Sequence, residues 1–186
     1  LSSAASDVYK RQSLSRALAR KLEPGDEVII SALDHEANRG PWLTLKEHGA
    51  TIKEIDLLPN GRLDYDQFES LVNAKTQIIA IGLASNSLGT VNDIHLITTL
   101  AKQHNALVVA DAVHYAAHYP VDVVSLDVDF LLCSAYKFYG PHVGILYTRD
   151  GLLDGLSTDY LSTQKSHAPY RIETGTLNYP ALAGVK

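Results

Sequence analysis

Gln77-Ile-Ile-Ala-Ile-Gly-Leu-Ala84, the segment Ile94–His104, and Ala106-Leu-Val-Val-Ala-Asp111 follow one another along the chain, and together they decide the fold. The first and third runs are almost entirely apolar, which favours strands that are buried on both faces. Between them, apolar residues recur at helical spacing, namely Ile94, Ile97, Leu100 and Ala101. An apolar strand, an amphipathic helix and a second apolar strand in this order predict a parallel strand–helix–strand unit.

The same alternation continues in both directions from this unit. Apolar spacing predicts a helix over 13–22, and helices are also predicted over 41–48 and, from its acidic start, over 64–72. Short apolar runs predict strands over 26–31, 129–134 and 143–147, and alternation predicts a strand over 51–55. Pro41 suits a first helical turn and Gly49 a C-terminal cap. The polar residues 151–170 are expected to form a loop or a mobile excursion. The predicted fold class is α/β, a three-layer α/β/α domain with a mostly parallel sheet.

Composition excludes several classes of function. The 186 residues carry a net charge of −5 without a Lys/Arg-rich run, which argues against a nucleic-acid or anionic-membrane surface. One cysteine cannot form an internal disulfide, and no hydrophobic run has the length of a membrane span. No secretory signal pattern opens the sequence, so the cytoplasm is the expected location. A nicotinamide-binding Rossmann domain is rejected, because no Gly-x-Gly-x-x-Gly turn follows the first strand.

Chemically reactive residues follow several of the predicted strands. Ligands of parallel α/β sheets gather at the carboxyl ends of the strands, so these residues are expected near one edge. The set contains a lysine, a carboxylate, two imidazoles and an amide: Lys137, Asp111, His35, His114 and Asn86.

Two of these residues have an ordinary and a catalytic interpretation. Lys137 could be a solvated strand-end lysine, or a desolvated amine that is nucleophilic enough to form a Schiff base. Asp111 could cap the next segment, or hold a pyridinium nitrogen protonated. A strand-terminal aspartate followed one strand later by a strand-terminal lysine is the arrangement that would bind a pyridoxal 5'-phosphate (PLP) ring at two positions. The lysine would form the Schiff base and the aspartate would contact the pyridinium nitrogen.

The motifs around these residues resemble class V aminotransferases of PLP fold type I, and most closely their cysteine desulfurase-like subgroup. The resemblance covers residues 13–186 and rests on motifs in the family's order: Leu33-Asp-His-Glu-Ala-Asn38 with Pro41-Trp42, Ser85-Asn-Ser-Leu-Gly-Thr90, Asp111-Ala-Val-His114, His118-Tyr-Pro-Val-Asp122, Asp129-Phe130, Ser134-Ala-Tyr-Lys-Phe-Tyr-Gly-Pro-His-Val-Gly-Ile-Leu-Tyr147 and Glu173-Thr-Gly-Thr-Leu-Asn178.

The resemblance implies roles for the strand-end residues. Lys137 would form the internal aldimine and move the proton at the substrate's α carbon. Asp111 would pair with the pyridinium nitrogen, and His35 would stack on the ring. Asn86 would lie near the cofactor's phenolic oxygen or the substrate. His114 stands close to that oxygen, where relatives usually have glutamine.

The resemblance also implies contacts with the cofactor's phosphate. Ser134 matches a phosphate-binding serine. Tyr136 departs from the subgroup, which commonly has a histidine before the lysine, although its hydroxyl could still donate a hydrogen bond. Thr176 matches a threonine that reaches the phosphate of the neighbouring subunit, which implies a homodimer with composite sites.

The resemblance further implies that both ends are truncated. Residues 13–186 would be an incomplete PLP-binding large domain, without the C-terminal small domain and without the threonine-bearing phosphate loop expected before Ser13. Residues 1–12 lack clear periodicity and are expected to be non-native or disordered, the alternative being a frayed natural N-terminus.

The implied function is that of a PLP-dependent enzyme acting on an amino acid, as a cysteine desulfurase or C–S lyase. A transaminase, epimerase or kynureninase-like enzyme of the same fold and an inactive fragment are the alternatives. Cys133 lies in an apolar strand and is expected to be inert, so it is not the desulfurase nucleophile. The remaining polar candidates are interpreted as surface or loop residues rather than ligands: His118, His142, His167 and Arg171.

Overall fold

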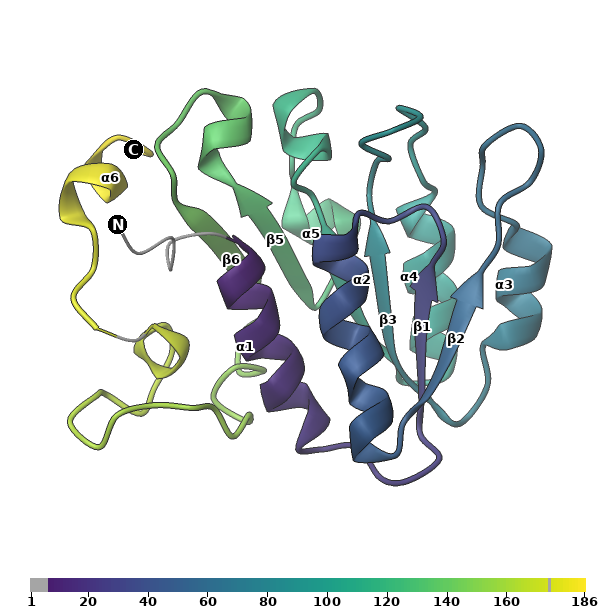
Figure 1. The fold of residues 1–186 in the computed structure, drawn as a ribbon, viewed down its shortest axis with the longest axis horizontal. Coiled ribbons are helices and arrows are strands. Elements are labelled where there is room, and N and C mark those ends of the chain that lie inside the picture. Colours follow the sequence, from purple (N-terminus) through teal and green to yellow (C-terminus); the bar gives the residue numbers. More distant parts are fainter. Residues whose placement is uncertain (1–6, 174) are drawn as a thin grey trace.

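A six-stranded sheet forms the centre of the computed structural model, which describes residues 7–173 and 175–186 (Figure 1). The strands are β1 (Glu27–Ser31), β2 (Thr51–Ile55), β3 (Thr76–Gly82), β4 (Leu107–Asp111), β5 (Phe130–Ser134) and β6 (Gly144–Thr148). Their spatial order is β2-β1-β3-β4-β5-β6. The first five are parallel to their neighbours, and the edge strand β6 runs antiparallel to β5.

Helices cover both faces of this sheet. Figure 1 shows α1 and α2 in front of the strands, and α3, α4 and α5 on the opposite side. The helix bounds are α1 (Asp7–Ala19), α2 (Glu36–Leu43), α3 (Tyr65–Leu71), α4 (Ile94–Gln103), α5 (Val123–Leu126) and α6 (Tyr179–Ala183), with short 3-10 helices η1 (Thr44–His48), η2 (Tyr115–Ala117), η3 (Ala135–Phe138) and η4 (Tyr170–Ile172). Among the described residues, no helix combines the length and the apolar character that crossing a membrane requires.

The two helix layers create two hydrophobic cores, because successive side chains of a strand point to opposite faces. Ile29 and Ile79 pack with Phe68 of α3 on one side. Val28 and Ile78 pack with Trp42 of α2 on the other. Strands buried on both faces need apolar side chains at nearly every position. The three-layer α/β prediction is therefore confirmed.

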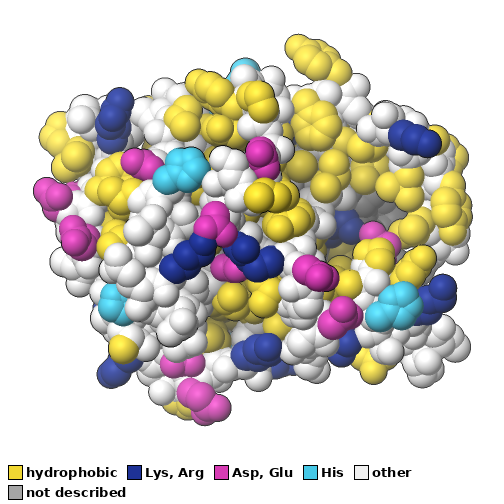
Figure 2. All heavy atoms as spheres, turned by 180° about the vertical axis from the view of Figure 1, so that it is seen from behind, with side chains coloured by type: hydrophobic (Ala, Val, Ile, Leu, Met, Phe, Trp, Pro, Cys, Tyr) yellow, Lys and Arg dark blue, Asp and Glu magenta, His cyan; other side chains and the backbone are white. Residues whose placement is uncertain are grey.

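The outer face of the α3–α5 layer carries charges of both signs next to one another (Figure 2). There Arg149 donates to Asp129 over 2.9 Å and to Asp127 over 2.8 Å, and Lys102 also pairs with Asp127. These pairs connect the end of β6 to the turn that precedes β5. The charges therefore neutralise one another locally and leave no large field of one sign on this face.

The boundaries of two helices differ from the prediction. Helix α1 begins at Asp7 rather than at residue 13, because buried ion pairs hold its first turns. Helix α2 begins at Glu36 and therefore contains Pro41 in its interior. An N-terminal cap by His35 starts this helix one and a half turns before the proline. Gly49 ends η1 in the left-handed conformation, as predicted.

The segment from residue 151 to 172 is irregular, as expected, but it is anchored to the domain. Leu153, Leu156 and Ile172 are buried in the core beneath α1. Arg171 donates to the carbonyl oxygens of Leu156 and Ser166. Arg171 is thus a loop residue rather than a ligand, as predicted, but its half-buried guanidinium satisfies backbone groups of the loop that carries it.

Candidate functional site

A pocket of about 200 Å³ opens at the carboxyl ends of the strands. All five reactive strand-end residues predicted from the sequence line it, although they come from different connections. Parallel strands end at the same edge of a sheet, which explains this convergence. The polar residues that line the strand-edge side of this pocket are Asp34, His35, Asn86, Asp111, His114, Tyr136 and Lys137.

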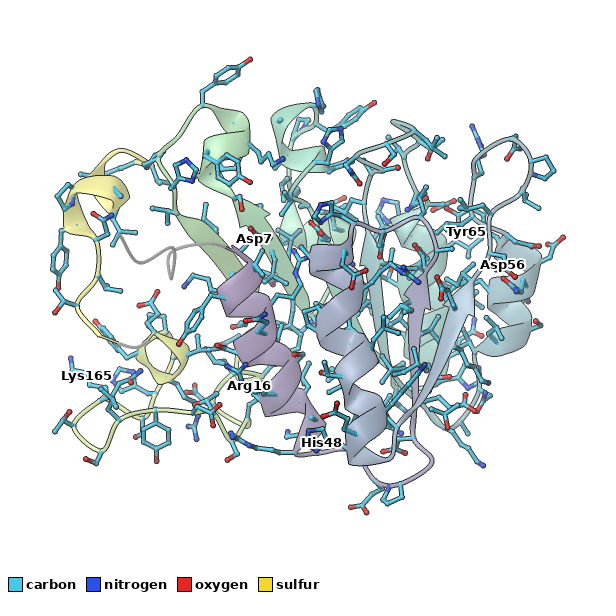
Figure 3. All side chains as sticks on the ribbon, viewed as in Figure 1. Asp7, Arg16, His48, Asp56, Tyr65 and Lys165 are labelled. Carbon is cyan, nitrogen blue, oxygen red and sulfur yellow. The ribbon has the colours of Figure 1, made fainter. Side chains whose placement is uncertain are left out.

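The first turn of α1 borders the same pocket. Figure 3 shows Asp7 at the end of α1 that lies near the carboxyl ends of the strands, whereas Arg16 and His48 lie towards the opposite edge. Asp7 and Val8 contribute to the pocket wall. The start of this helix therefore determines how much of the strand edge is open.

Lys137 reaches the pocket from η3, directly after β5. Its Nζ lies 5.5 Å from the ring centroid of Tyr136, which stacks on His142 with 4.6 Å between centroids. The Lys137 side chain is exposed, so of the two interpretations of this lysine the structure shows the solvated one. The cause is its position in an open turn beyond the strand end.

Asp111 ends β4 with both carboxylate oxygens engaged. Oδ1 accepts from the backbone N–H of Val113 and Oδ2 from Nη1 of Arg11, each over 2.8 Å. Arg11 is fully buried and also donates to Asp7 over 3.1 Å. Its Nε is buried without a hydrogen-bond partner. The guanidinium of Arg11, which has one unpaired N–H, therefore already donates to the carboxylate with which a pyridinium N–H would pair.

His35 has its ring orientation set by the backbone. Its Nδ1 accepts a hydrogen bond from the N–H of Ala37 over 3.0 Å and so caps α2. An Nδ1 that accepts carries no proton, so the neutral ring has its proton on Nε2. The side chain is otherwise exposed and faces the pocket. The cap leaves one face of the ring available to a planar ligand.

Asp34, which sequence reasoning missed, forms part of the pocket wall. Its Oδ1 accepts from the N–H of Gly82 over 2.9 Å, and Oδ2 accepts from Nδ2 of Asn38 over 2.8 Å. Burial raises the pKa of Asp34 to about 6, and the negative charge of Asp111 adds to that effect. The sequence feature that could have pointed to this contact is Gly82 at the end of the apolar strand β3.

Comparison with known proteins identifies the family to which this arrangement belongs. The family model described as aminotransferase class-V matches residues 11–186. The chain belongs to the class V aminotransferase family. A cysteine desulfurase of Shigella sonnei is 40% identical over 175 residues, which cover 87% of this chain and 43% of that protein. A cysteine desulfurase of Escherichia coli K12 is 39% identical with the same coverage.

Solved structures agree with this assignment. The cysteine desulfurase CsdA of Escherichia coli superposes with a TM-score of 0.90 at 29% identity, covering 97% of this chain and 49% of that one. An apo cysteine desulfurase of Thermococcus onnurineus also gives a TM-score of 0.90, at 25% identity, with 97% and 48% covered. The chain thus spans about half the length of the relatives that it matches.

Enzymes of the class V aminotransferase family use PLP, and the residues of the pocket fit this cofactor. An exposed amine, a strand-end carboxylate and a pre-oriented imidazole all face one space. Arg11 already donates to Oδ2 of Asp111, so its guanidinium would compete with a pyridinium N–H for this carboxylate.

The two other residues that the family resemblance assigns to the phosphate are not brought into the pocket. Ser134 is fully buried and its hydroxyl donates to Asp7. Thr176 is exposed near the C-terminus and does not line the pocket. Tyr136 does line it, with its ring 42% exposed. Of the three residues that the resemblance assigns to the cofactor's phosphate, Tyr136 is therefore the one that lines the pocket.

Cys133 is unsuited to attack a substrate, as the sequence predicts. It lies in β5 and is 7% exposed. Burial raises the pKa of its thiol to about 11, and the negative charges of Asp111 and Asp7 act in the same direction. The thiolate, which is the nucleophile, is therefore scarce at neutral pH.

The three histidines that the sequence placed on the surface are exposed. His118 contacts the ring of His114 with 5.3 Å between centroids, and His142 stacks on Tyr136. His167 meets Tyr170 edge to face, far along the chain from the pocket residues. Two of the three thus lie beside pocket residues rather than apart from the site.

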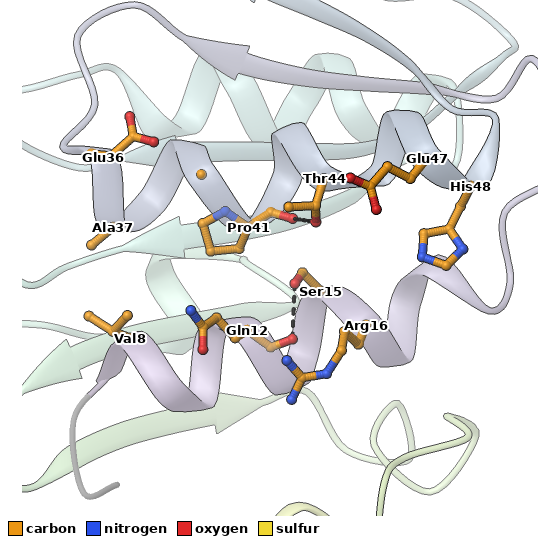
Figure 4. Close-up of a pocket in the computed structure, with 11 residues that line it drawn as sticks. Val8, Gln12, Ser15, Arg16, Glu36, Ala37, Pro41, Thr44, Glu47 and His48 are labelled. Atoms are coloured by element: carbon orange, nitrogen blue, oxygen red, sulfur yellow. Dashed lines mark hydrogen bonds between the residues drawn. The ribbon is translucent and has the colours of Figure 1, made fainter. Parts of the chain in front are cut away.

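A larger hollow of about 610 Å³ lies between α1 and α2 (Figure 4). The hydroxyl of Ser15 donates to the carbonyl of Gln12, and that of Thr44 donates to the carbonyl of Pro41. These hydroxyls are therefore committed to their own helices. No lysine is among the described residues that line this hollow, whereas Lys137 lines the pocket at the strand edge.

Proposed function

We propose that this chain is the cofactor-binding part of a PLP-dependent enzyme that acts on an amino acid, with Lys137 as the amine that carries the cofactor. One observation supports the proposal above all others. Lys137, Asp111 and His35 come from three separate connections and line the same pocket. Family membership supports the same cofactor.

The chain's own residues then have distinct tasks. When bound, PLP supplies an electron sink for the substrate's α carbon. Lys137 holds the cofactor and moves the proton at that carbon. Asp111 keeps a proton on the pyridinium nitrogen, which maintains the electron sink. His35 orients the ring by stacking on its exposed face.

The neighbouring polar residues would bind the cofactor's periphery. His114 and Asn86 line the pocket and would contact the phenolic oxygen or the substrate. Tyr136 would donate its hydroxyl to the phosphate, and Ser134 would do so only after releasing Asp7. Thr176 is exposed, which is compatible with a contact to a second subunit in a homodimer. Sedimentation analysis tests the dimer, and a monomer at micromolar concentration contradicts it.

The proposed reaction is sulfur removal from cysteine or a related C–S bond cleavage. Relatives that are 39–40% identical are cysteine desulfurases, which supports this choice over the other reactions of the fold. The inert Cys133 implies that the attacking thiol belongs to a part of the protein outside this chain. Release of sulfide from cysteine by the intact protein tests the reaction, and transamination without sulfide would refute it.

We also propose that residues 13–186 are part of the PLP-binding large domain and that residues 1–12 are foreign to it. The family model matches residues 11–186 and leaves residues 1–10 outside, which agrees with this boundary to within two residues. Resequencing the genomic locus tests it, because a different reading frame upstream of Ser13 is expected. The proposal includes a cytoplasmic location, which cell fractionation tests.

The decisive experiment is an absorbance titration of the chain with PLP. We expect a yellow band that borohydride bleaches and that Lys137→Ala abolishes. Lys165→Ala is the matched control, because Lys165 is also exposed and also lies over a tyrosine ring, 4.7 Å from the centroid of Tyr170. A band that survives Lys137→Ala, or no band in the unaltered chain, would refute cofactor binding through Lys137 in this chain.

A further inference from the structure

Asp34 joins two elements that are 48 residues apart in sequence. It lies in the turn between β1 and α2, and its Oδ1 accepts from the N–H of Gly82 at the end of β3. The carbonyl of Gly82 is held by Nδ2 of Asn92 over 2.7 Å. β1 and β3 are paired only as far as Ile29 and Ile79, so the Gly82 N–H lies beyond that pairing. Asp34 supplies the missing acceptor.

Gly82 leaves just enough space for this contact. A Cβ at position 82 would lie 2.6 Å from Oδ1 of Asp34, well inside the usual contact distance. On its other side β3 pairs with β4, where Gly82 is the register partner of Asp111. The glycine therefore lets two carboxylates from neighbouring connections approach the same point of the sheet edge.

The second oxygen of Asp34 anchors the start of α2. Oδ2 accepts from Nδ2 of Asn38, which is buried, and Oδ1 of Asn38 lies 3.5 Å from Nε1 of the fully buried Trp42. These contacts continue along one side of the helix at intervals of four residues. They connect the pocket wall to the core beneath α2.

We infer that Asp34 is a positioning residue, whose carboxylate ties the β1–α2 turn to β3 and so holds His35 against the pocket. His35 follows Asp34 directly and caps the same helix, so the position of its ring depends on where this turn lies. The inference rests on the proposed function, because it assigns His35 a cofactor to face. It assigns Asp34 a role that acts through the turn and His35.

The charge on Asp34 determines whether both hydrogen bonds can exist. The Gly82 N–H and the Asn38 amide are donors, and the Ser31 side chain also bonds to this carboxylate, so a protonated carboxyl must give up one acceptor or force the amide of Asn38 to rotate. The pKa of about 6 puts this change just below neutral pH. The charged or titratable groups that line the pocket with Asp34 are Asp7, His35, Asp111, His114, Tyr136 and Lys137, and the buried Arg11 pairs with Asp111.

The first test uses ¹⁵N nuclear magnetic resonance on the chain without cofactor. We expect the Gly82 amide resonance to move with a midpoint near pH 6, and Asp34→Asn to abolish that movement. In Asp34→Ala the Gly82 amide hydrogen is expected to exchange about tenfold faster, as loss of one charged hydrogen bond implies. Asp64→Ala, which removes the cap of α3, is the matched control and leaves Gly82 unchanged.

The second test uses the cofactor and a readout that general loss of structure does not reproduce. Asp34→Ala is expected to keep the borohydride-sensitive band, because Lys137 is intact, but to change the visible circular dichroism of that band. Asp34→Glu is expected to restore part of the signal. If Asp34→Ala does not fold, Asp34→Leu, which keeps the bulk of the side chain but has no acceptor, replaces it in both measurements.

The outcomes separate this inference from the proposed function. An unchanged Gly82 amide together with unchanged visible dichroism overturns the role of Asp34. A Gly82 amide that responds as expected supports the connection that Asp34 makes between the β1–α2 turn and β3, even if the chain shows no yellow band. Without that band the proposed function fails, and the link between Asp34 and the cofactor fails with it.

Discussion

Replacing Asp34 by asparagine should change how the stability of this domain depends on pH. Asp34 accepts hydrogen bonds from Gly82 and Asn38 while it is ionised, yet burial and the charge of Asp111 raise its pKa from 3.8 to about 6. Asparagine keeps the shape and an acceptor for Gly82 but cannot ionise. The comparison therefore isolates the charge from the packing.

The sign follows from proton binding in the two states. Between about pH 4 and pH 6 the folded protein keeps the Asp34 proton while the unfolded chain has lost it. The contribution of Asp34 to stability is therefore full below pH 4 and is lost as pH rises through 6. A pKa moved from 3.8 to about 6 corresponds to roughly 3 kcal/mol, and solvent screening at the pocket reduces this to about 2 kcal/mol.

Urea denaturation of both proteins at pH 4, 5, 6 and 7.5 measures this quantity. The free energy of unfolding of the natural chain minus that of Asp34→Asn should fall by about 2 kcal/mol from pH 4 to pH 7.5. Other titrating groups largely cancel in the difference. A difference that stays constant within 0.5 kcal/mol, or rises with pH, would refute a buried carboxyl with a raised pKa at this position.

Three further predictions concern neighbouring residues. Gly82→Ala should lower the free energy of unfolding by about 1–3 kcal/mol in urea, because its Cβ would meet Asp34, whereas Gly155→Ala, whose nearest contact is 3.5 Å, should not; equal midpoints would contradict this. Cys133 should react with a disulfide reagent at pH 8 about 100-fold more slowly in the native chain than in urea, and equal rates would show that its thiol is accessible. Arg11→Gln should raise the affinity for PLP about tenfold in absorbance titrations by freeing Asp111, and an unchanged affinity would mean that Arg11 does not compete.

Much of the fold could be predicted from local sequence because its signals are local. Strands buried on both faces require continuous apolar runs, as in β1 and β3, and the alternating edge strand β2 was predicted at its observed bounds, Thr51–Ile55. Errors occurred where a side chain decided a boundary. The cap by His35 moved the start of α2 ahead of Pro41, and the partners of Arg11 extended α1 to Asp7.

The sequence by itself determined that five reactive residues would share one pocket, since every parallel strand ends at the same edge. Only the tertiary structure decided what those residues contact. The pairing of Arg11 with Asp111 spans 100 residues, and that of Asp34 with Gly82 spans 48. Such pairings have no periodic signature, because they depend on the distances between layers and strands rather than on spacing along the chain. For the same reason the sequence predicted that Ser134 lies in a strand but not that its hydroxyl bonds to Asp7.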